Sequence, residues 1–311
     1  MKKLILILAA TLVSAATISA QTVAEATECY NQAAQYLDGG DYANAVSYFK
    51  QALATAEKCE TGADEVIANC KSTIAKVQFE IAKSYLRDKN FDNAIAQYAV
   101  AKADAQLYGD DEVVANVDEV LPKAYLQKAL ALQGSKDFAG SIEAAKKVLE
   151  LEPDNGTAAL VLGKSCLSAG KTADAEAAFK LAKANGKEKD ADKQLSTLYL
   201  KKAQAALKAG KLDEVIKQAT LSNECVENAN AYKLCASASQ KLGKTQDMIA
   251  YYEKYLAISP NAKDAAGVNY TIAVTYQQAG NKAEAVKYYQ KVVGDPTYGA
   301  QAQQQISALG N

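Results

Sequence analysis

Small and apolar residues recur along this chain at distances that two packed helices would produce. One pattern occurs seven times: a small or apolar residue, called the anchor below, is followed by further apolar or small residues four and seven positions later. Spacings of four and three place these positions on one face of a helix. The residue twelve positions before each anchor is always Ala or Gly, which indicates an earlier helix that crosses the later one closely. The anchors are Ala45, Ala94, Ser141, Ala175, Val215, Met248 and Ala285, and the earlier small residues are Ala33, Ala82, Ala129, Gly163, Ala203, Ala236 and Ala273.

A turn is predicted between the two helices of each unit. Five residues before the anchor the sequence has Gly in five of the seven units, and Gly tolerates the positive φ that ends a helix. Lys89 and Lys136 replace this Gly in the second and third units, and Pro153 and Pro260 end two of the second helices. The pattern therefore predicts a tandem series of helical hairpins, each of which must stack on its neighbours to bury its apolar face.

These hairpins resemble the tetratricopeptide repeat, a helix–turn–helix of about 34 residues. The fifth unit is the poorest match, with Ala206 and Ala219 where bulky residues are usual. The best single match is the series Tyr36, Gly40, Tyr42, Ala45, Phe49 and Ala52.

The resemblance implies an all-α fold, namely a right-handed superhelical solenoid of about seven repeats with a C-terminal capping helix. It implies a single domain over residues 21–311, in which the polar stretch 298–309 is the capping helix that a solenoid end requires. The repeats are expected near residues 26–60, 64–108, 111–155, 156–188, 192–228, 229–263 and 266–297.

The first two repeats carry insertions that resemble each other. Residues 62–69 and 109–116 share the order of a Gly, acidic residues and an apolar run that ends in Ala-Asn. Each segment is typical of an acidic N-cap followed by a helix that continues into the next repeat. We interpret them as an internal duplication of a 47-residue variant with long helices.

The first twenty residues have the pattern of a secretory signal peptide. Lys2 and Lys3 precede an apolar run from Leu4 to Val13, and small residues end the segment at Ala20. We therefore expect an exported chain, periplasmic or secreted in a bacterium, that begins at Gln21 and has no membrane span after cleavage. The alternative is an uncleaved anchor, for which the apolar run is short.

The residue content argues against catalysis and against a bound cofactor. The chain has no His, so it lacks the ordinary Ser–His and Cys–His nucleophiles and the zinc-binding helices that depend on His. We predict that it is not an enzyme, holds no metal and needs no cofactor. With 35 basic and 36 acidic residues, it has no overall charge that would favour nucleic acid or an anionic membrane.

Six cysteines become relevant if the chain is exported, because an oxidising compartment permits disulfides. Cys29 lies near the start of one predicted helix and Cys59 near the end of its antiparallel partner, so the two are a candidate pair. Cys70 competes for the same site.

In the tetratricopeptide family the first helix of each hairpin lines a concave groove, and the groove positions lie 18, 15, 11, 8 and 7 residues before the anchor. Nearly all charged residues at these offsets are basic, and we read the first helices of repeats three to seven as free of Asp and Glu, which predicts a cationic groove. The predicted groove residues are Lys76, Phe79, Lys83, Arg87, Lys123, Leu126, Lys164, Lys208, Lys233, Lys241 and Tyr270.

These positions predict a non-enzymatic interaction scaffold that binds a protein or peptide segment, acidic in character, in the groove. One alternative is a binding protein for a small anionic ligand or a glycan, although bidentate recognition of small anions favours Arg and the groove offers only Arg87. Two structural alternatives stay open, since Lys is a common solubilising residue on helices and the apolar residues at one offset could pack adjacent repeats.

Overall fold

The computed structural model describes residues 18–310, and these form fifteen helices and no strand. The described residues divide into two compact units, with the boundary between Lys171 and Thr172. The all-α fold of stacked hairpins is therefore confirmed. The single domain over residues 21–311 stays a prediction.

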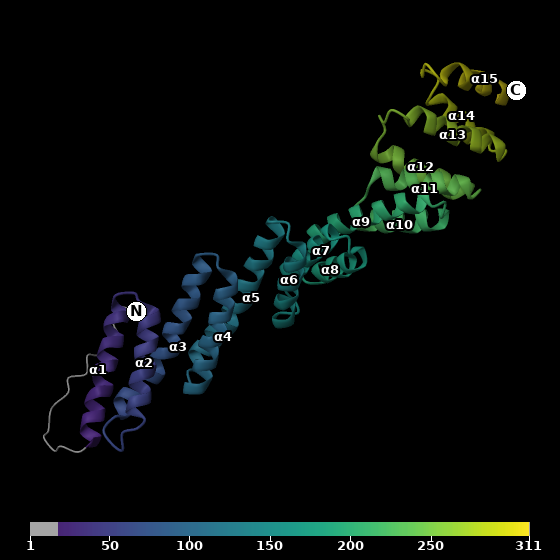
Figure 1. The fold of residues 1–311 in the computed structure, drawn as a ribbon. Coiled ribbons are helices and arrows are strands. Elements are labelled where there is room, and N and C mark those ends of the chain that lie inside the picture. The colour runs from purple at the N-terminus through teal and green to yellow at the C-terminus, as the bar shows by residue number, and fades with distance from the viewer. Residues whose placement is uncertain (1–17, 311) are drawn as a thin grey trace. The chain divides into compact units, whose positions relative to one another are not determined.

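Unit 1 contains seven helices, in which each helix packs on the next (Figure 1). Contacts of α1 with α3, α3 with α5 and α5 with α7 place the first helices of the hairpins in one layer, beside a layer of second helices. The helices are α1 (Ile18–Asp38), α2 (Tyr42–Ala56), α3 (Asp64–Arg87), α4 (Phe91–Tyr108), α5 (Asp111–Gly134), α6 (Phe138–Leu151) and α7 (Gly156–Ser168).

Unit 2 repeats this arrangement with eight helices, and Figure 1 shows them in teal to yellow. The first helices α9 and α11 contact each other, as those of unit 1 do. The helices are α8 (Thr172–Ala184), α9 (Glu188–Lys208), α10 (Leu212–Cys225), α11 (Ala229–Lys241), α12 (Thr245–Ile258), α13 (Ala265–Gln278), α14 (Lys282–Gln290) and α15 (Gly299–Leu309).

The small residues predicted at the helix crossings lie in the core. Gly163 is buried, and the six alanines twelve residues before the other anchors have no exposed surface at all. The seven anchors are equally buried, with Met248 the most exposed of them at 2%. In the hairpins whose two helices lie in one unit, a larger side chain at either position would force the paired helices apart, which explains the restriction to Ala on their first helices.

The seven hairpin turns share one backbone conformation. The residue five positions before the anchor has positive φ in every turn, including Lys89 at 57° and Lys136 at 65°. The next N–H donates to the carbonyl five residues back, as in the bond from Asp41 N to Tyr36 O (2.8 Å), and this is the Schellman pattern of helix ends. The two lysines therefore occupy the glycine conformation that the sequence pattern predicted for the turn.

The insertions lengthen the helices, as the sequence indicated. Both α3 and α5 have 24 residues, and α4 has 18. Asp110 caps α5, because its carboxylate accepts from the N–H of Val113 (3.1 Å). Asp64 does not cap α3 as the matching segment suggested. It is the first helical residue after Ala63, which has no side chain able to cap the helix.

The C-terminal helix α15 covers the end of unit 2. Ala302 is buried against the core, and Gln277 of α13 donates to Gln305 of α15 (2.8 Å). The exposed side of α15 carries Gln301, Gln303 and Gln304, so a polar surface ends the stack, as expected of the capping helix.

The predicted signal peptide, residues 1–20, lies outside the described residues except for its last three, where α1 begins. Among the helices of residues 18–310, none combines the length and the apolar composition that crossing a bilayer requires.

Candidate partner-binding surface

Helix α3 presents its four predicted groove residues at spacings of three and four, on one side of the helix. Lys76 and Arg87 are exposed, whereas Lys83 is half-buried. The Phe79 ring packs on the ring of the buried Tyr98 (5.4 Å between centroids), and the Lys83 ammonium lies 5.6 Å from the Phe79 centroid. One side of the Phe79 ring therefore packs on the core, and the Lys83 ammonium lies over the ring.

Three of the predicted groove cations in unit 1 have acidic partners within the chain. Lys76 pairs with Asp110 (3.8 Å), the residue that caps α5. Lys83 pairs with Glu80 (2.7 Å) and Lys123 with Glu119 (2.7 Å), in both cases one turn away on the same helix. These pairs reduce the positive field that the sequence alone suggested.

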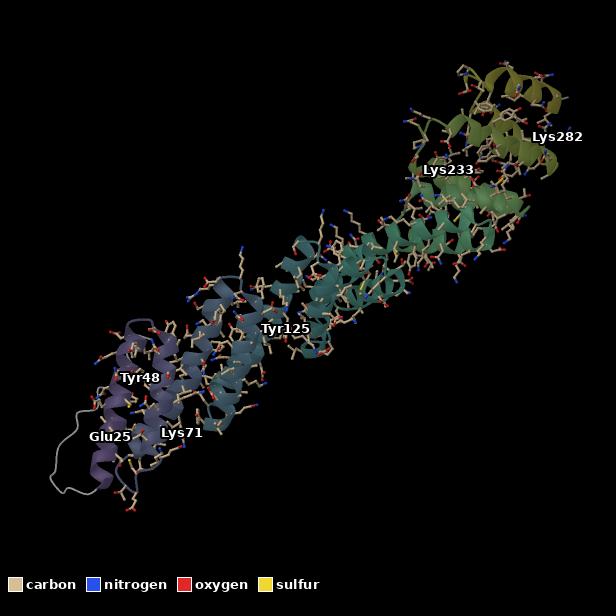
Figure 2. All side chains as sticks on the ribbon, viewed as in Figure 1. Glu25, Tyr48, Lys71, Tyr125, Lys233 and Lys282 are labelled. Carbon is tan, nitrogen blue, oxygen red and sulfur yellow. The ribbon has the colours of Figure 1, made fainter. Side chains whose placement is uncertain are left out.

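Lys233 in unit 2 is also paired. Its ammonium contacts the carboxylate of Asp264 and lies 5.6 Å from the ring centroid of Tyr255, whose hydroxyl donates to the same carboxylate (2.5 Å) (Lys233 is labelled in Figure 2). Burial by itself raises the pKa of Asp264, but the hydrogen bonds from Lys233 and Tyr255 outweigh it and hold that pKa below its usual range. Lys233 therefore has a structural role between α11, α12 and the loop before α13.

The reading that the first helices of repeats three to seven lack acidic residues is wrong. Helix α5 includes Asp118 and Glu119, and α9 includes Glu188, Asp190 and Asp192. The cause is helix length, since α5 and α9 begin several residues earlier than a standard repeat would.

The remaining predicted cations, Arg87, Lys164, Lys208 and Lys241, are exposed, and none forms an ion pair with a described residue. Arg87, Lys208 and Lys241 are the last residues of α3, α9 and α11, where a cation also interacts favourably with the helix dipole. Lys164 lies inside α7 and has no such explanation.

The apolar residues fifteen positions before the anchors mostly pack adjacent repeats. Tyr30 and Leu160 are buried, and Phe79, Leu126 and Leu200 pack partly buried against core clusters. Their burial favours the packing alternative for this column.

Tyr270 is covered by the capping segment. Its ring stacks on Tyr298 (5.1 Å) and meets the edge of Tyr289 (5.4 Å). The Tyr270 ring is therefore shared with the capping segment rather than presented freely for a partner.

Leu130 is an exposed residue at a predicted groove position that the sequence analysis did not select. It lies eleven residues before Ser141, the same offset at which α3 has Lys83 and α7 has Lys164. Its side chain is 47% exposed on α5, which contacts both α3 and α7. The available signal was a leucine at an offset where the first helices before and after it in unit 1 have lysine. We call Lys83, Arg87, Leu130 and Lys164 the α3–α5–α7 face.

The cysteines Cys29 and Cys59 are both free thiols in the structure, although both pack against the same core cluster as Cys70. The Cys59 thiol lies 3.4 Å from the hydroxyl of Thr22, which precedes Cys29 by two turns of α1. Burial, with a smaller contribution from Cys29, raises the pKa of Cys70 to about 12. The bridge between Cys29 and Cys59 stays a prediction.

Among residues 18–310, no group of three Cys, Asp or Glu side chains is arranged to hold a metal ion. Two surface depressions lie at hairpin loops of unit 2, one along Lys244–Asp247 and one formed by Gly210–Glu214 with Leu242. Neither contains a predicted groove residue.

Tandem helical hairpins with small residues at every crossing define a helical repeat protein. Models described as tetratricopeptide repeat match residues 28–63, 126–190, 229–262 and 266–294, which together span just over half of the chain. The chain belongs to the tetratricopeptide repeat family. The segments without a match hold the long-helix insertions and the fifth repeat, where the sequence departs most from the family pattern.

No curated protein matches the sequence. Among solved structures, MamA is 24% identical and covers 56% of this chain and 96% of its own, with a TM-score of 0.32. YrrB, described as a TPR protein with an unusual peptide-binding site, is 17% identical over 63% of this chain and 97% of its own (TM-score 0.34). PilW, described as a type IV pilus biogenesis factor, is 18% identical and covers 76% of this chain and 99% of its own (TM-score 0.29). Similarity at this level carries no information on function.

Proposed function

We propose that this chain is an exported, non-enzymatic scaffold that binds a protein or peptide segment on the α3–α5–α7 face. The observation that supports this most is the exposure of Leu130 between Lys83 and Lys164 at one offset of three adjacent first helices. A leucine exposed to water on a face with cations on both sides fits a partner that is both apolar and acidic.

The partner we propose is a segment with one apolar side chain and flanking carboxylates. The apolar side chain would cover Leu130, and the carboxylates would pair with Arg87 and Lys164, which form no ion pair with any residue of 18–310. Arg87 offers a bidentate contact, whereas Lys164 offers a point charge. Lys83 contributes less because Glu80 already neutralises it.

The export part of the proposal rests on the first twenty residues. Expression in a bacterium, followed by N-terminal sequencing of the chain recovered from the periplasm, would test it. We expect the recovered chain to begin at Gln21. A chain that keeps Met1 and stays with the cytoplasmic fraction would contradict export.

The binding part is tested with a displayed peptide library selected on the immobilised chain, followed by anisotropy titration of the selected peptide. We expect acidic peptides with a central apolar residue, and an affinity that falls as salt rises. Arg87→Glu with Lys164→Glu should weaken binding at least about tenfold, because two favourable charges become repulsive.

The matched control is Lys58→Glu with Lys171→Glu, which changes net charge equally at exposed positions of unit 1 outside the first helices. We expect the control to bind as the parent chain does. Equal weakening by both double variants would show a nonspecific charge effect and contradict the site. Thermal stabilisation by small anions, with no peptide selected, would support the anionic-ligand alternative instead.

A further inference from the structure

Helix α4 exposes an apolar seam on the side opposite its core contacts. Its core-facing residues include Ala94, Tyr98, Ala101 and Ala105, all without exposed surface. Its solvent-facing residues carry no charge over about 16 Å of helix. They are Ala96, Ala99, Val100, Ala103, Gln106 and Leu107.

The seam has the spacing of a helix–helix interface. Ala96, Val100, Ala103 and Leu107 follow one another by four, three and four residues, the order in which a coiled-coil stripe contacts a partner helix. Leu107 is 72% exposed and Val100 39%. These are large apolar surfaces for a helix that has no neighbour on that side.

Other second helices of unit 1 lack such a seam. The exposed side of α6 carries Glu143, Lys146, Lys147 and Glu150. The exposed side of α2 carries Asn44, Ser47 and Gln51. The apolar seam is therefore a property of α4 and not of second helices in general.

The charged residues of α4 are all engaged beside the seam. Asp92 pairs with Lys128, Lys102 with Asp118 (2.5 Å), and Asp104 with Lys50 (3.0 Å). A helix that approached the seam would not have to desolvate an unpaired charge, which is the main cost of covering a surface helix.

The seam is complementary to itself when two copies run antiparallel. Small and large residues alternate along it, so a two-fold axis near its midpoint places Leu107 against Ala96 of the second copy and Val100 against Ala103 of the second copy. A parallel pair in register would set leucine against leucine and alanine against alanine, which leaves gaps. An isologous contact also closes on itself and ends at a dimer.

We propose that the α4 seam, Ala96, Val100, Ala103 and Leu107, is the contact through which two copies of this chain form an antiparallel dimer. Three turns of helix bury less than the roughly 800 Å² per partner of a standard interface, so the dimer is weak and reversible. It leaves the first helices, and with them the α3–α5–α7 face, on the other layer of each copy. The proposal is independent of what that face binds.

Sedimentation of the full chain from about 10 µM to about 500 µM tests the dimer. We expect a concentration-dependent shift from monomer towards dimer, weakened at least about tenfold by Leu107→Glu, because the charge would face Ala96 of the second copy. Leu151→Glu is the matched control, since Leu151 is another exposed leucine (48%), at the end of α6 and outside the seam. A chain that stays monomeric throughout, or a dimer weakened equally by both variants, would overturn the proposal.

Cysteine cross-linking tests the orientation. A mixture of Ala96→Cys and Leu107→Cys chains should form the mixed disulfide under mild oxidation, and mass spectrometry distinguishes it from bridges of the native cysteines. Efficient cross-linking of Leu107→Cys chains with themselves would show a parallel pair and contradict the antiparallel arrangement.

Discussion

At the scale of the single residue, the hairpin turns depend on a left-handed backbone conformation. Glycine adopts it without steric cost, but in a lysine the Cβ approaches the following carbonyl, at a cost of about 1 kcal/mol. Lys89 and Lys136 adopt this conformation, with φ of 57° and 65°, where five other hairpins have glycine. The surrounding hairpin keeps the same geometry, so the strain is offset by the packing of the two helices.

We expect Lys89→Gly to raise the free energy of unfolding by about 0.5–1 kcal/mol, because strain relief exceeds the added entropy of the unfolded chain. The reverse test is Gly170→Ala, which should lower the free energy of unfolding by about 1 kcal/mol. Apart from residue 170 itself and its two chain neighbours, no atom lies within 4 Å of the Cβ that an alanine would place there, so any loss comes from the local backbone alone. Urea denaturation measures both. A Lys89→Gly variant less stable than the parent would contradict this account.

A second residue-scale feature is the hydroxyl of Tyr98. The side chain has no exposed surface, its oxygen has no hydrogen-bond partner, and burial raises the pKa of Tyr98 to about 12. Phe49 and Phe179 stand at the same position of other repeats. We expect Tyr98→Phe to stabilise the chain by up to about 1 kcal/mol, since a buried donor without a partner is removed at constant shape. Loss of stability in the same urea assay would reveal a partner for this hydroxyl.

At the scale of the element, a single carboxylate joins α8 to α9. Glu176 of α8 accepts hydrogen bonds from Lys180 of its own helix (2.7 Å), from Tyr199 of α9 (2.9 Å) and from Lys202 of α9. Burial alone would raise the pKa of Glu176, but the three donors outweigh it and lower that pKa from 4.5 to about 2.

We expect Glu176→Gln to cost about 1–2 kcal/mol at neutral pH, after allowance for screening by water. Because the folded-state pKa lies below its ordinary value of 4.5, this stabilisation is complete above about pH 5 and is lost as the pH falls from 4.5 through 2. Thermal melts of the parent chain and of Glu176→Gln across this pH range measure the difference in stability between them. A stability gap that stays constant down to pH 2.5 would show that the carboxylate charge is not its source.

The helices and turns were predictable from the sequence where steric limits within one hairpin determine which residues can occur. The alanines at the helix crossings and the glycines of the turns follow from steric limits that act within one hairpin, so the repeats were recognised from spacing alone. The start of α9 at Glu188 was missed because its acidic first turns are compatible with either a loop or a helix.

The candidate site was less predictable, in part because two of its ion pairs join residues that are distant in sequence. Lys76 meets Asp110 and Lys233 meets Asp264 only once neighbouring helices are in place. The charges of these two lysines are therefore neutralised by aspartates that lie just before a later helix, and no spacing rule within a repeat connects the two residues. Leu130 was missed for the opposite reason, since an exposed leucine is recognisable only from the fold.

At the scale of the whole molecule, the stability of stacked repeats is a sum over neighbours. Tyr98 lies in α4, which packs on α3 and α5, whereas Glu176 lies in α8, which packs on α9. We expect the effects of Tyr98→Phe and Glu176→Gln to add within about 0.5 kcal/mol in the double variant. A larger interaction energy in urea denaturation would indicate cooperativity beyond adjacent repeats.

The raised pKa values of four cysteine thiols, two of them buried and two half-buried, combine with the lack of histidine to limit proton binding and release near neutral pH. Histidine is the residue whose charge ordinarily changes near neutral pH, and this chain has none. Burial raises the pKa of Cys29 and Cys225, that of Cys235 to about 11 and that of Cys70 to about 12. The chain thus has little buffering capacity around neutrality, and a partner that docks on it should exchange almost no protons with the solvent. Calorimetric binding enthalpies measured in phosphate and in Tris, which differ in ionisation heat, should therefore agree.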